Sequence, residues 1–301
     1  MAVAPALYKV ASRHSTRYNY RNRTPTQERS VDAPMPGDPW LVLLGFGVGT
    51  LGTLIGAGGG FILVPALILL YPAEKPEILT ALSLSVVFFN ALSGTIAYAR
   101  MKRIDYKSGI LFTIAGIPGA LLGAHTVAYL PRRAFEVLFS VLMMGVAGYL
   151  MWRPGRDEAH DAPPAPDPEA RTRFLTKRLK VGMVLSLFVG YIANLLGIGG
   201  GIIHVPAMIH LLKFPVHVAT ATSHFILTFL ALAGTAEHAA QGAYASTARH
   251  AAFLALGAVM GAQVGARLST RIRGPWIVRG LAAGLALAGI RILAMAAGRH
   301  P

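Results

Sequence analysis

The sequence contains no cysteine, so disulfide bonds, thiolate metal sites and thiol chemistry are all excluded. Charged residues are also scarce, at 14% of the 301 residues, whereas a soluble domain carries about a quarter. Only 13 residues are acidic against 28 Lys and Arg, which gives a formal net charge of +15. Apolar residues make up 54% of the chain. This balance predicts a membrane protein rather than a soluble domain.

No nucleic-acid-binding module accompanies the positive charge. The basic residues lie mainly in the N-terminal tail and in the loops between apolar runs, as the positive-inside rule expects of a membrane protein. The sequence also lacks a Gly-xxxx-Gly-Lys-Ser/Thr nucleotide-binding loop, a His-Glu-x-x-His motif and a nucleophile motif. We therefore expect no nucleic-acid partner, no ATP-driven mechanism, no cofactor and no enzymatic activity.

Composition changes along the chain predict four segments. They are a basic tail at 1–38, a first membrane segment at 39–152, a hydrophilic linker at 153–180 and a second membrane segment at 181–298. The tail has no apolar signal-peptide core and is typical of a disordered cytosolic segment, with an organellar transit peptide as the alternative. The linker is rich in proline and in charge of both signs.

Apolar runs near the length needed to cross a ~30 Å hydrocarbon core follow one another in both membrane segments. The first run of each segment has 32 residues. A straight helix of that length would measure about 48 Å, so each of these two runs needs a break. The expected spans are 40–71, 78–99, 108–130, 134–152, 181–212, 218–236, 243–266 and 276–297.

A glycine block lies inside each of the two long runs. Residues 56–60 read GAGGG and are followed by Val64-Pro65. Residues 197–201 read GIGGG and are followed by Val205-Pro206, so every matched position lies 141 residues later. Glycine costs a helix roughly 1 kcal/mol relative to alanine, and three in a row therefore predict a broken helix at both places.

Weaker echoes follow the glycine blocks in the same order. Residues 80–83 (TALS) match 220–223 (TATS), and residues 119–124 (GALLGA) match 261–266 (GAQVGA). In the second pair the spacing of small residues is typical of close helix packing. Together the echoes predict an all-α polytopic membrane protein with about eight transmembrane helices in two tandem repeats, each with a glycine-broken first helix.

Loop charges bear on the orientation of the repeats. If each glycine run crosses the membrane once, both termini share a side with the loops 100–107, 153–180 and 237–250. That side then holds 19 Lys and Arg against seven on the other, so both termini are expected in the cytoplasm and the repeats are parallel. If each run turns back as a hairpin, the repeats are inverted, as in many transporters. Charge favours the parallel arrangement.

The broken helices are the expected binding site. A helix interrupted at membrane depth leaves free backbone N–H groups, and the positive end of a half-helix suits a small oxyanion. The alternative is that these glycines only allow close helix packing. Two serines are matched between the repeats, and an asparagine comes just before the second block. The candidate substrate-binding residues are Gly56, Gly58, Gly59, Gly60, Gly197, Gly199, Gly200, Gly201, Ser83, Ser223, Asn194 and His204.

Two histidines of the second repeat have apolar counterparts in the first. His204 is matched by Leu63 and His224 by Leu84. An ionisable residue at membrane depth is a functional candidate, so His204 is expected to pair with an anion or carry a proton. The alternative is a neutral histidine bonded to a carbonyl group. A metal site is the weaker interpretation, because no carboxylate accompanies these histidines.

These motifs resemble the TauE/SafE family of sulfite exporter-type permeases. The resemblance rests on the duplicated glycine blocks with their Val-Pro, the Thr-Ala-x-Ser echoes and the Gly-Ala-x-x-Gly-Ala echoes, and it covers about residues 40–297. It implies a multi-pass transporter of a bacterial inner membrane that moves sulfite, sulfonates or related sulfur-containing anions. The basic tail, His204 and His224 have no counterpart in the family pattern.

Residues and resemblance together predict a secondary transporter in the lipid bilayer. It would move a small sulfur-containing anion, such as sulfite or an organosulfonate, by alternating access between the two halves. The driving energy would come from an ion gradient or from the substrate's own gradient, with proton coupling through His204. The alternatives are an anion channel and a metal-ion permease that uses His204 and His224.

Overall fold

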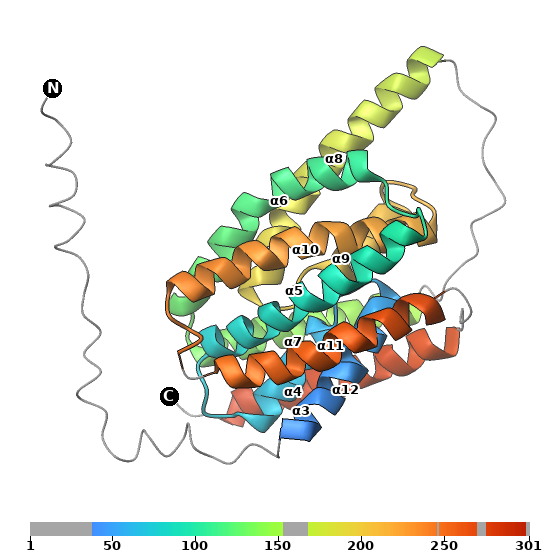
Figure 1. Ribbon diagram of the computed structural model, residues 1–301. Helices are drawn as coiled ribbons and strands as arrows, with labels where there is room; N and C mark the ends of the chain where they lie inside the picture. The colour runs from blue at the N-terminus through green and yellow to red at the C-terminus, as the bar shows by residue number, and fades with distance from the viewer. Residues whose placement is uncertain (1–37, 153–167, 246, 270–274, 299–301) are drawn as a thin grey trace, which may run out of the picture. The chain divides into compact units, whose positions relative to one another are not determined.

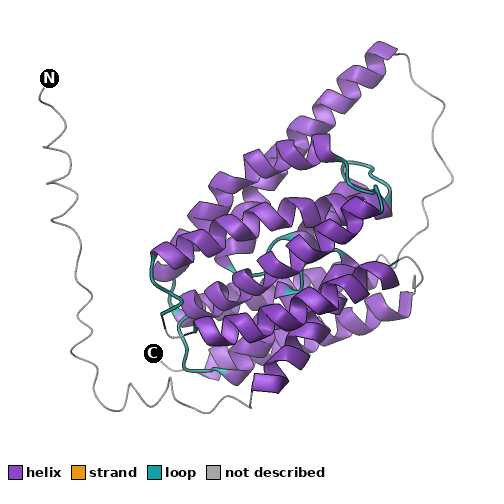
Figure 2. Ribbon diagram, viewed as in Figure 1, coloured by secondary structure: helices purple, strands orange, loops and turns teal. Residues whose placement is uncertain are grey.

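The computed structural model describes residues 38–152, 168–245, 247–269 and 275–298 (Figure 1). Within these ranges every regular element is a helix and no strand is present (Figure 2). The all-α prediction is therefore confirmed. Apart from Asp38, the predicted tail lies outside the described residues, and so does the predicted linker up to residue 167.

The described chain falls into two halves with the same order of helices. The N-terminal half consists of α3 (Asp38–Ile55), α4 (Gly60–Leu70), α5 (Pro76–Arg100), α6 (Tyr106–Thr126), the 3₁₀ turn η2 (Val127–Tyr129) and α7 (Arg132–Trp152). The C-terminal half consists of α8 (Pro168–Leu195), α9 (Gly201–His210), α10 (Val216–Ala240), α11 (Ala248–Leu268) and α12 (Pro275–Gly298).

Local sequence signals account for most helix boundaries. The glycine blocks end α3 and α8 where the sequence predicts a break. Pro76 is the first residue of α5, where its missing N–H costs nothing. The Asp105 side chain caps α6 by accepting a hydrogen bond from the backbone N–H of Ser108. One boundary differs from expectation, because α8 begins at Pro168, inside the stretch predicted as a linker.

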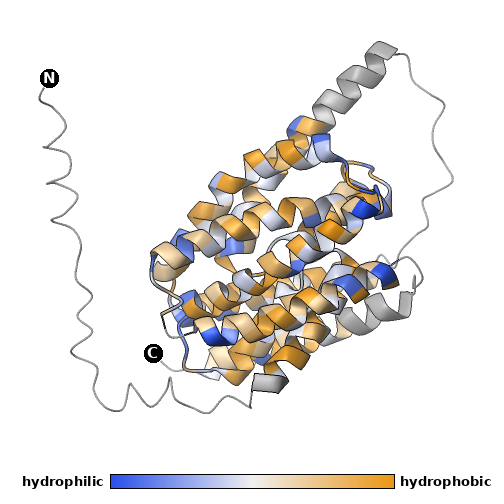
Figure 3. Ribbon diagram, viewed as in Figure 1, coloured by the Kyte–Doolittle hydropathy of each residue, from blue (hydrophilic) through white to orange (hydrophobic). Residues whose placement is uncertain are grey.

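Among the described residues, four helices are long and apolar enough to cross a membrane: α5, α6, α10 and α11. Shorter apolar helices include α4 and α9, the half-helices that follow the glycine blocks. Apolar residues dominate the middle of the helices (Figure 3). These features support a multi-pass membrane protein.

The long helices α6, α10, α5 and α11 are successive neighbours (Figure 1). The central pair, α5 and α10, is antiparallel. Thr80 near the start of α5 contacts His238 near the end of α10, with 3.4 Å between Oγ1 and Nε2. At the other end, Tyr98 of α5 packs in one cluster with Ala221 near the start of α10.

The first glycine block turns the chain back on itself. Helices α3 and α5 run in the same direction, because both run parallel to α11. The half-helix α4 between them therefore returns toward the start of α5. The contacts that show these directions are Val42–Gly257 and Thr50–Gly265 between α3 and α11, and Ser93–Val259 and Tyr98–Ser269 between α5 and α11.

The second glycine block does the same. Helices α8 and α10 both run parallel to α6, so α9 returns between them. The two halves therefore run in opposite directions. The assumption that each glycine run crosses once does not hold, and the helix directions favour the inverted arrangement. The contacts are Gly116–Ser186 and Gly123–Tyr191 between α6 and α8, and Gly109–Phe225 and His125–Glu237 between α6 and α10.

Each half contributes a helix that packs against the first helix of the other half. A Cβ atom added to Gly119 or Gly123 of α6 would lie 2.0 or 2.2 Å from a backbone oxygen of α8. Gly261 of α11 has the same relation to α3, where the carbonyl oxygen of Phe46 would lie 2.2 Å away. The prediction that these small residues serve close packing is confirmed.

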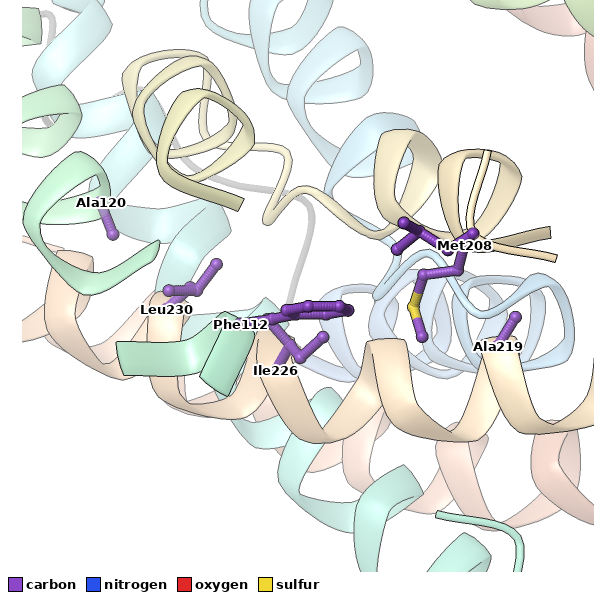
Figure 4. Packing of buried hydrophobic residues seen from close by; sticks show 7 residues of the cluster. Phe112, Ala120, Met208, Ala219, Ile226 and Leu230 are labelled. Atoms are coloured by element: carbon purple, nitrogen blue, oxygen red, sulfur yellow. The ribbon is translucent and has the colours of Figure 1, made fainter. Parts of the chain in front are cut away.

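The half-helices are fixed to their neighbours by apolar contacts and by one buried ion pair. Figure 4 shows Met208 of α9 beside Ala219 of α10, within an apolar cluster that also holds Phe112 of α6. The C-terminal end of α4 is held by Arg132, whose guanidinium donates to the carbonyl oxygens of Ile68, Tyr71 and Glu74. The buried carboxylate of Glu136 accepts from Arg132 Nε at 2.7 Å and orients it.

Candidate functional site

The two glycine blocks adopt the same backbone conformation. In residues 56–60 the first, third and fourth φ angles are 84°, 78° and 85°. In residues 197–201 the corresponding angles are 71°, 78° and 88°. Glycine adopts these left-handed angles without the steric cost that a Cβ atom brings, so the sequence of the blocks is explained by their backbone. All ten residues are buried.

The blocks also lie directly against each other. A Cβ atom at Gly60 would lie 2.7 Å from the carbonyl oxygen of Gly197. Reciprocally, a Cβ atom at Gly201 would lie 2.5 Å from the carbonyl oxygen of Gly56. Each block thus faces the first residue of the other half's short helix, and only glycine permits the approach.

Half of the predicted N–H donors are already bonded within the protein. The N–H of Gly56 donates to Thr53 O at 3.1 Å, and that of Gly58 donates to Gly52 O at 3.1 Å. In the second block Gly197 and Gly199 donate in the same way to carbonyl oxygens of α8, at 3.3 and 3.4 Å. These four glycines cap the ends of α3 and α8, so their N–H groups are not free for a ligand.

Six other N–H groups remain. Those of Gly59, Gly60 and Phe61 begin α4 and have no acceptor in the described part of the chain. Those of Gly200, Gly201 and Ile202 begin α9 and also have none there. All six residues are buried, and a buried N–H normally has a partner. Phe61 and Ile202 could not be predicted from the sequence, because the type of an apolar side chain carries no information on whether its backbone N–H is bonded.

Ser83 and Ser223 hold the blocks from the opposite half. The hydroxyl of Ser83 donates to Gly197 O at 2.7 Å, and that of Ser223 donates to Gly56 O at 3.4 Å. Both serines are fully buried. Since each hydroxyl proton is used on a carbonyl oxygen, the serines position the glycine blocks rather than offer a donor to a ligand.

Asn194 lies at the end of α8, one turn before the second block. Its Nδ2 donates to Gly190 O of the same helix at 3.0 Å. Its Oδ1 is buried without a donor and lies 2.1 Å from the position that a Cβ of Gly234 would take. The structure therefore places Asn194 beside α10 rather than at the free N–H groups.

His204 lies one turn into α9 and is 1% exposed. Its Nε2 is 3.2 Å from Ser186 Oγ, and the Ser186 hydroxyl donates to Phe112 O at 2.6 Å. Because the hydroxyl proton is already committed, His204 must donate from Nε2, which leaves Nδ1 as a bare acceptor. This Nδ1 has no partner and lies toward Gly200, 3.4 Å from the position of an added Cβ.

A second buried polar chain connects the other histidine to the first block. His224 Nε2 is 3.4 Å from Thr53 Oγ1, and Thr53 donates to Asn90 Oδ1 at 3.1 Å. Asn90 Nδ2 in turn donates to Gly58 O at 3.0 Å. The sequence did not single out Thr53 or Asn90, because only the fold brings α3, α5 and α10 together here.

The two histidines do not form a joint site. His204 bonds to α8 and His224 to α3, as described above. No group of three or more His, Cys, Asp or Glu side chains in the described ranges is arranged to hold a metal ion. The histidines instead flank the glycine blocks separately, one at each block.

Comparison with known proteins agrees with this membrane architecture. The family model "Sulfite exporter TauE/SafE" matches residues 41–292. The probable membrane transporter protein YunE of Bacillus subtilis is 33% identical over 264 residues, which cover 84% of this chain and 96% of that protein. A probable membrane transporter protein of Methanocaldococcus jannaschii, MJ0441, is 27% identical over 65% of this chain and 70% of its own length.

A probable membrane transporter protein of Xylella fastidiosa is 29% identical over 76% of this chain and 82% of its own length. No solved structure matches the chain. The family match covers both glycine blocks and both halves. The chain therefore belongs to the TauE/SafE family and is a membrane transporter rather than an enzyme.

Proposed function

We propose that this protein is a secondary transporter for a small sulfur-containing oxyanion, such as sulfite or an organosulfonate. The observation that carries the proposal is the set of six buried N–H groups at the starts of α4 and α9, which have no acceptor in the described part of the chain. Two helix N-termini that face each other form a site of positive potential without a charged side chain. An oxyanion offers several acceptor oxygens to such a set of donors.

The family description supports sulfur as the central atom of the substrate, since the matching model is that of sulfite exporters. His204 would complete the site. Its Nδ1 lies beside Gly200 at the positive end of α9, so a proton on this atom is disfavoured unless an anion is bound there. Anion and proton would then stabilise each other, which is the basis of coupling.

Alternating access would involve the two inverted halves, in each of which a glycine-broken hairpin would be followed by three helices that we expect to cross the membrane. This arrangement amounts to eight membrane elements in two repeats. The glycine blocks meet in the region of Val87 and Leu227, near the middle of α5 and α10. A site at that depth can be exposed to one side and then to the other by movement of one half against the other.

The hairpins and the loop charges together support one orientation in the cell membrane. The loop 101–105, the end of α7 and the start of α8 lie at one end of the helices, and the starts of α3 and α5 lie at the other. At the first end, 100–107 carries four Lys and Arg and 153–180 carries seven. At the other end, 71–76 carries one and 127–133 carries two, and the long tail 1–38, which counts for less in the rule, carries six. By the positive-inside rule the first end would be cytoplasmic, so the start of α3 and the end of α12 would lie outside, opposite to the orientation expected from single crossings.

Single cysteines test this orientation cleanly, because the natural chain has none. Tyr129 and Lys102 are exposed at opposite ends of the helices. In intact cells a membrane-impermeant maleimide is expected to label Tyr129→Cys and to label Lys102→Cys only after permeabilisation. The unmodified chain is the blank. The reverse labelling pattern would instead support the orientation predicted from the sequence, with both termini in the cytoplasm.

Transport is tested by counterflow in proteoliposomes. Vesicles preloaded with unlabelled sulfite are expected to accumulate labelled sulfite transiently, and a panel of organosulfonates shows which anions compete. A channel gives flux without this transient accumulation, because only a carrier exchanges bound substrate. A metal-ion permease predicts metal uptake that is lost in His204→Ala. If no anion of the panel moves, the proposed function is wrong.

A further inference from the structure

Three histidines of α10 lie on one face of the helix. His217, His224 and His238 are separated by 7 and 14 residues. At 100° per residue, each interval returns the side chain to within about 40° of the same direction. At 1.5 Å per residue the three span about 32 Å along the helix, which is close to the thickness of a bilayer core. We call these three residues the histidine stripe.

Two members of the stripe, His224 and His238, are fully buried and share one bonding pattern. His238 Nε2 is 3.4 Å from Thr80 Oγ1 of α5, and Thr80 is 3.0 Å from the carbonyl oxygens of Pro76 and Glu77. The hydroxyl proton of Thr80 is therefore used on a backbone carbonyl, and that of Thr53 beside His224 is used on Asn90 Oδ1. Both histidines must donate from Nε2, and both have a buried Nδ1 without a partner.

Burial disfavours a charge on either ring, and at His224 two neighbouring groups offset part of that cost. His224 bonds to Thr53 in the last turn of α3, where helix carbonyl groups carry partial negative charge. Its ring and that of Tyr98 of α5 form a T-shaped pair, with 5.4 Å between ring centroids. Neither a carboxylate nor a basic side chain bonds to His224 in the described part of the chain.

The end of the stripe at His238 is close to a surface pair. The neighbouring residue, Glu237, pairs with His125 of α6 at 2.9 Å and accepts from Gln241 Nε2 at 2.8 Å. Tyr244 of the loop 241–247 also reaches this end, where its hydroxyl donates to Ala81 O at 2.8 Å. Burial raises the pKa of Tyr244 to about 12, so this phenol stays neutral and does not compete for a proton.

We propose that the histidine stripe also binds protons that drive transport, with His224 and His238 as buried proton-binding groups in addition to His204. This inference rests on the proposed function. A proton enters at Nδ1 of a neutral imidazole and gives an imidazolium, and its release restores the neutral ring. The chain from His224 through Thr53 and Asn90 to Gly58 O links that charge to the first glycine block. Proton binding and anion binding are thereby coupled reciprocally.

Assays in proteoliposomes measure the coupling of transport to protons separately from the exchange of anions. Exchange is measured as counterflow at equal pH, and coupling as uphill accumulation under a pH gradient. The probes are sulfite and methanesulfonate, since the sulfonate does not titrate near neutral pH. One pH unit can drive at most about tenfold accumulation per coupled proton, since 1.4 kcal/mol corresponds to a factor of ten. For His224→Gln and His238→Gln we expect accumulation near onefold with counterflow retained.

The matched control is His250→Gln in α11, which replaces another histidine whose Nδ1 has no partner but which lies off the stripe. It should keep accumulation at the unmodified level. Unmodified accumulation in both stripe variants overturns the proposal. Counterflow without pH-driven accumulation in the unmodified protein also overturns it, and leaves the proposed function standing.

Absence of counterflow in the unmodified protein refutes the proposed function. Proton binding by the histidine stripe can then still be measured directly. Nitrogen-15 spectra of the full chain in lipid nanodiscs distinguish a neutral imidazole with the proton on Nε2 from an imidazolium. The stripe requires reversible imidazolium signals at His224 and His238 when the pH is lowered. Rings that stay neutral at every pH refute the proposal independently of transport.

Discussion

Gly201→Ala is expected to abolish transport. The added methyl carbon would lie 2.5 Å from Gly56 O and 2.6 Å from the Cα of Ala57, so the two glycine blocks would have to separate. Gly201 does not have a positive φ, and the collision between the blocks is therefore the main cost of the change. Overpacking of this kind costs about 1–3 kcal/mol, and it also displaces the N–H groups that begin α9. Counterflow should fall below detection.

Two companion variants give this prediction its control. Gly60→Ala makes the reciprocal collision with Gly197 O and should have the same effect. Gly47→Ala adds the same methyl group to α3 at a position with no atom within 4 Å, and it should transport normally. Normal counterflow by Gly201→Ala would show that the contact between the blocks is unimportant.

Gly261→Val is expected to prevent assembly of the folded protein. Gly257, Gly261 and Gly265 line the contact of α11 with α3, and their added Cβ atoms would lie 2.0 to 2.3 Å from backbone oxygens. Backbone atoms cannot rotate away as a side chain can, so the helices must move apart. Small residues at such contacts supply much of helix association in membranes, where apolar burial does not.

The readout is folded yield in detergent, measured by size-exclusion chromatography, together with thermal stability. We expect Gly261→Val to aggregate or to lose most of its folded yield. Gly284→Val in α12 is the matched control, because an added Cβ there meets nothing within 4 Å. Equal yields for the two variants would contradict the packing role. Transport need not be measured, so this outcome is separate from that of Gly201→Ala.

The positions of the helices and of both breaks could be predicted because their signals are local. The length of an apolar run, a glycine block and a proline one turn later are all visible within 32 residues. The direction of the chain after each break could not be predicted in this way. It depends on contacts such as Thr80 with His238, which lie 158 residues apart in the sequence. In the sequence, the charge of the loops was the only indirect indication of chain direction, and it favoured the parallel arrangement.

The candidate site was predictable to the level of the block but not of the individual N–H group. Gly58 and Gly59 have similar φ angles, yet Gly58 donates to the end of α3 whereas Gly59 has no acceptor in the described ranges. The difference depends on which groups the preceding helix end reaches, and composition carries no such information. The series of polar contacts from His224 to Gly58 could not be predicted for a related reason, because its members come from three helices.

The contact between the glycine blocks has a consequence for the reset step of the proposed cycle. The carbonyl oxygens of Gly56 and Gly197 lie against the positive ends of α9 and α4, where they present partial negative charge of the protein's own. In the proposed cycle this partial charge would offset part of the positive potential of the two helix starts while no anion is bound. A carrier whose empty site is offset in this way can return without a second anion, so the proposed transporter would be suited to net movement of its substrate rather than obligatory exchange.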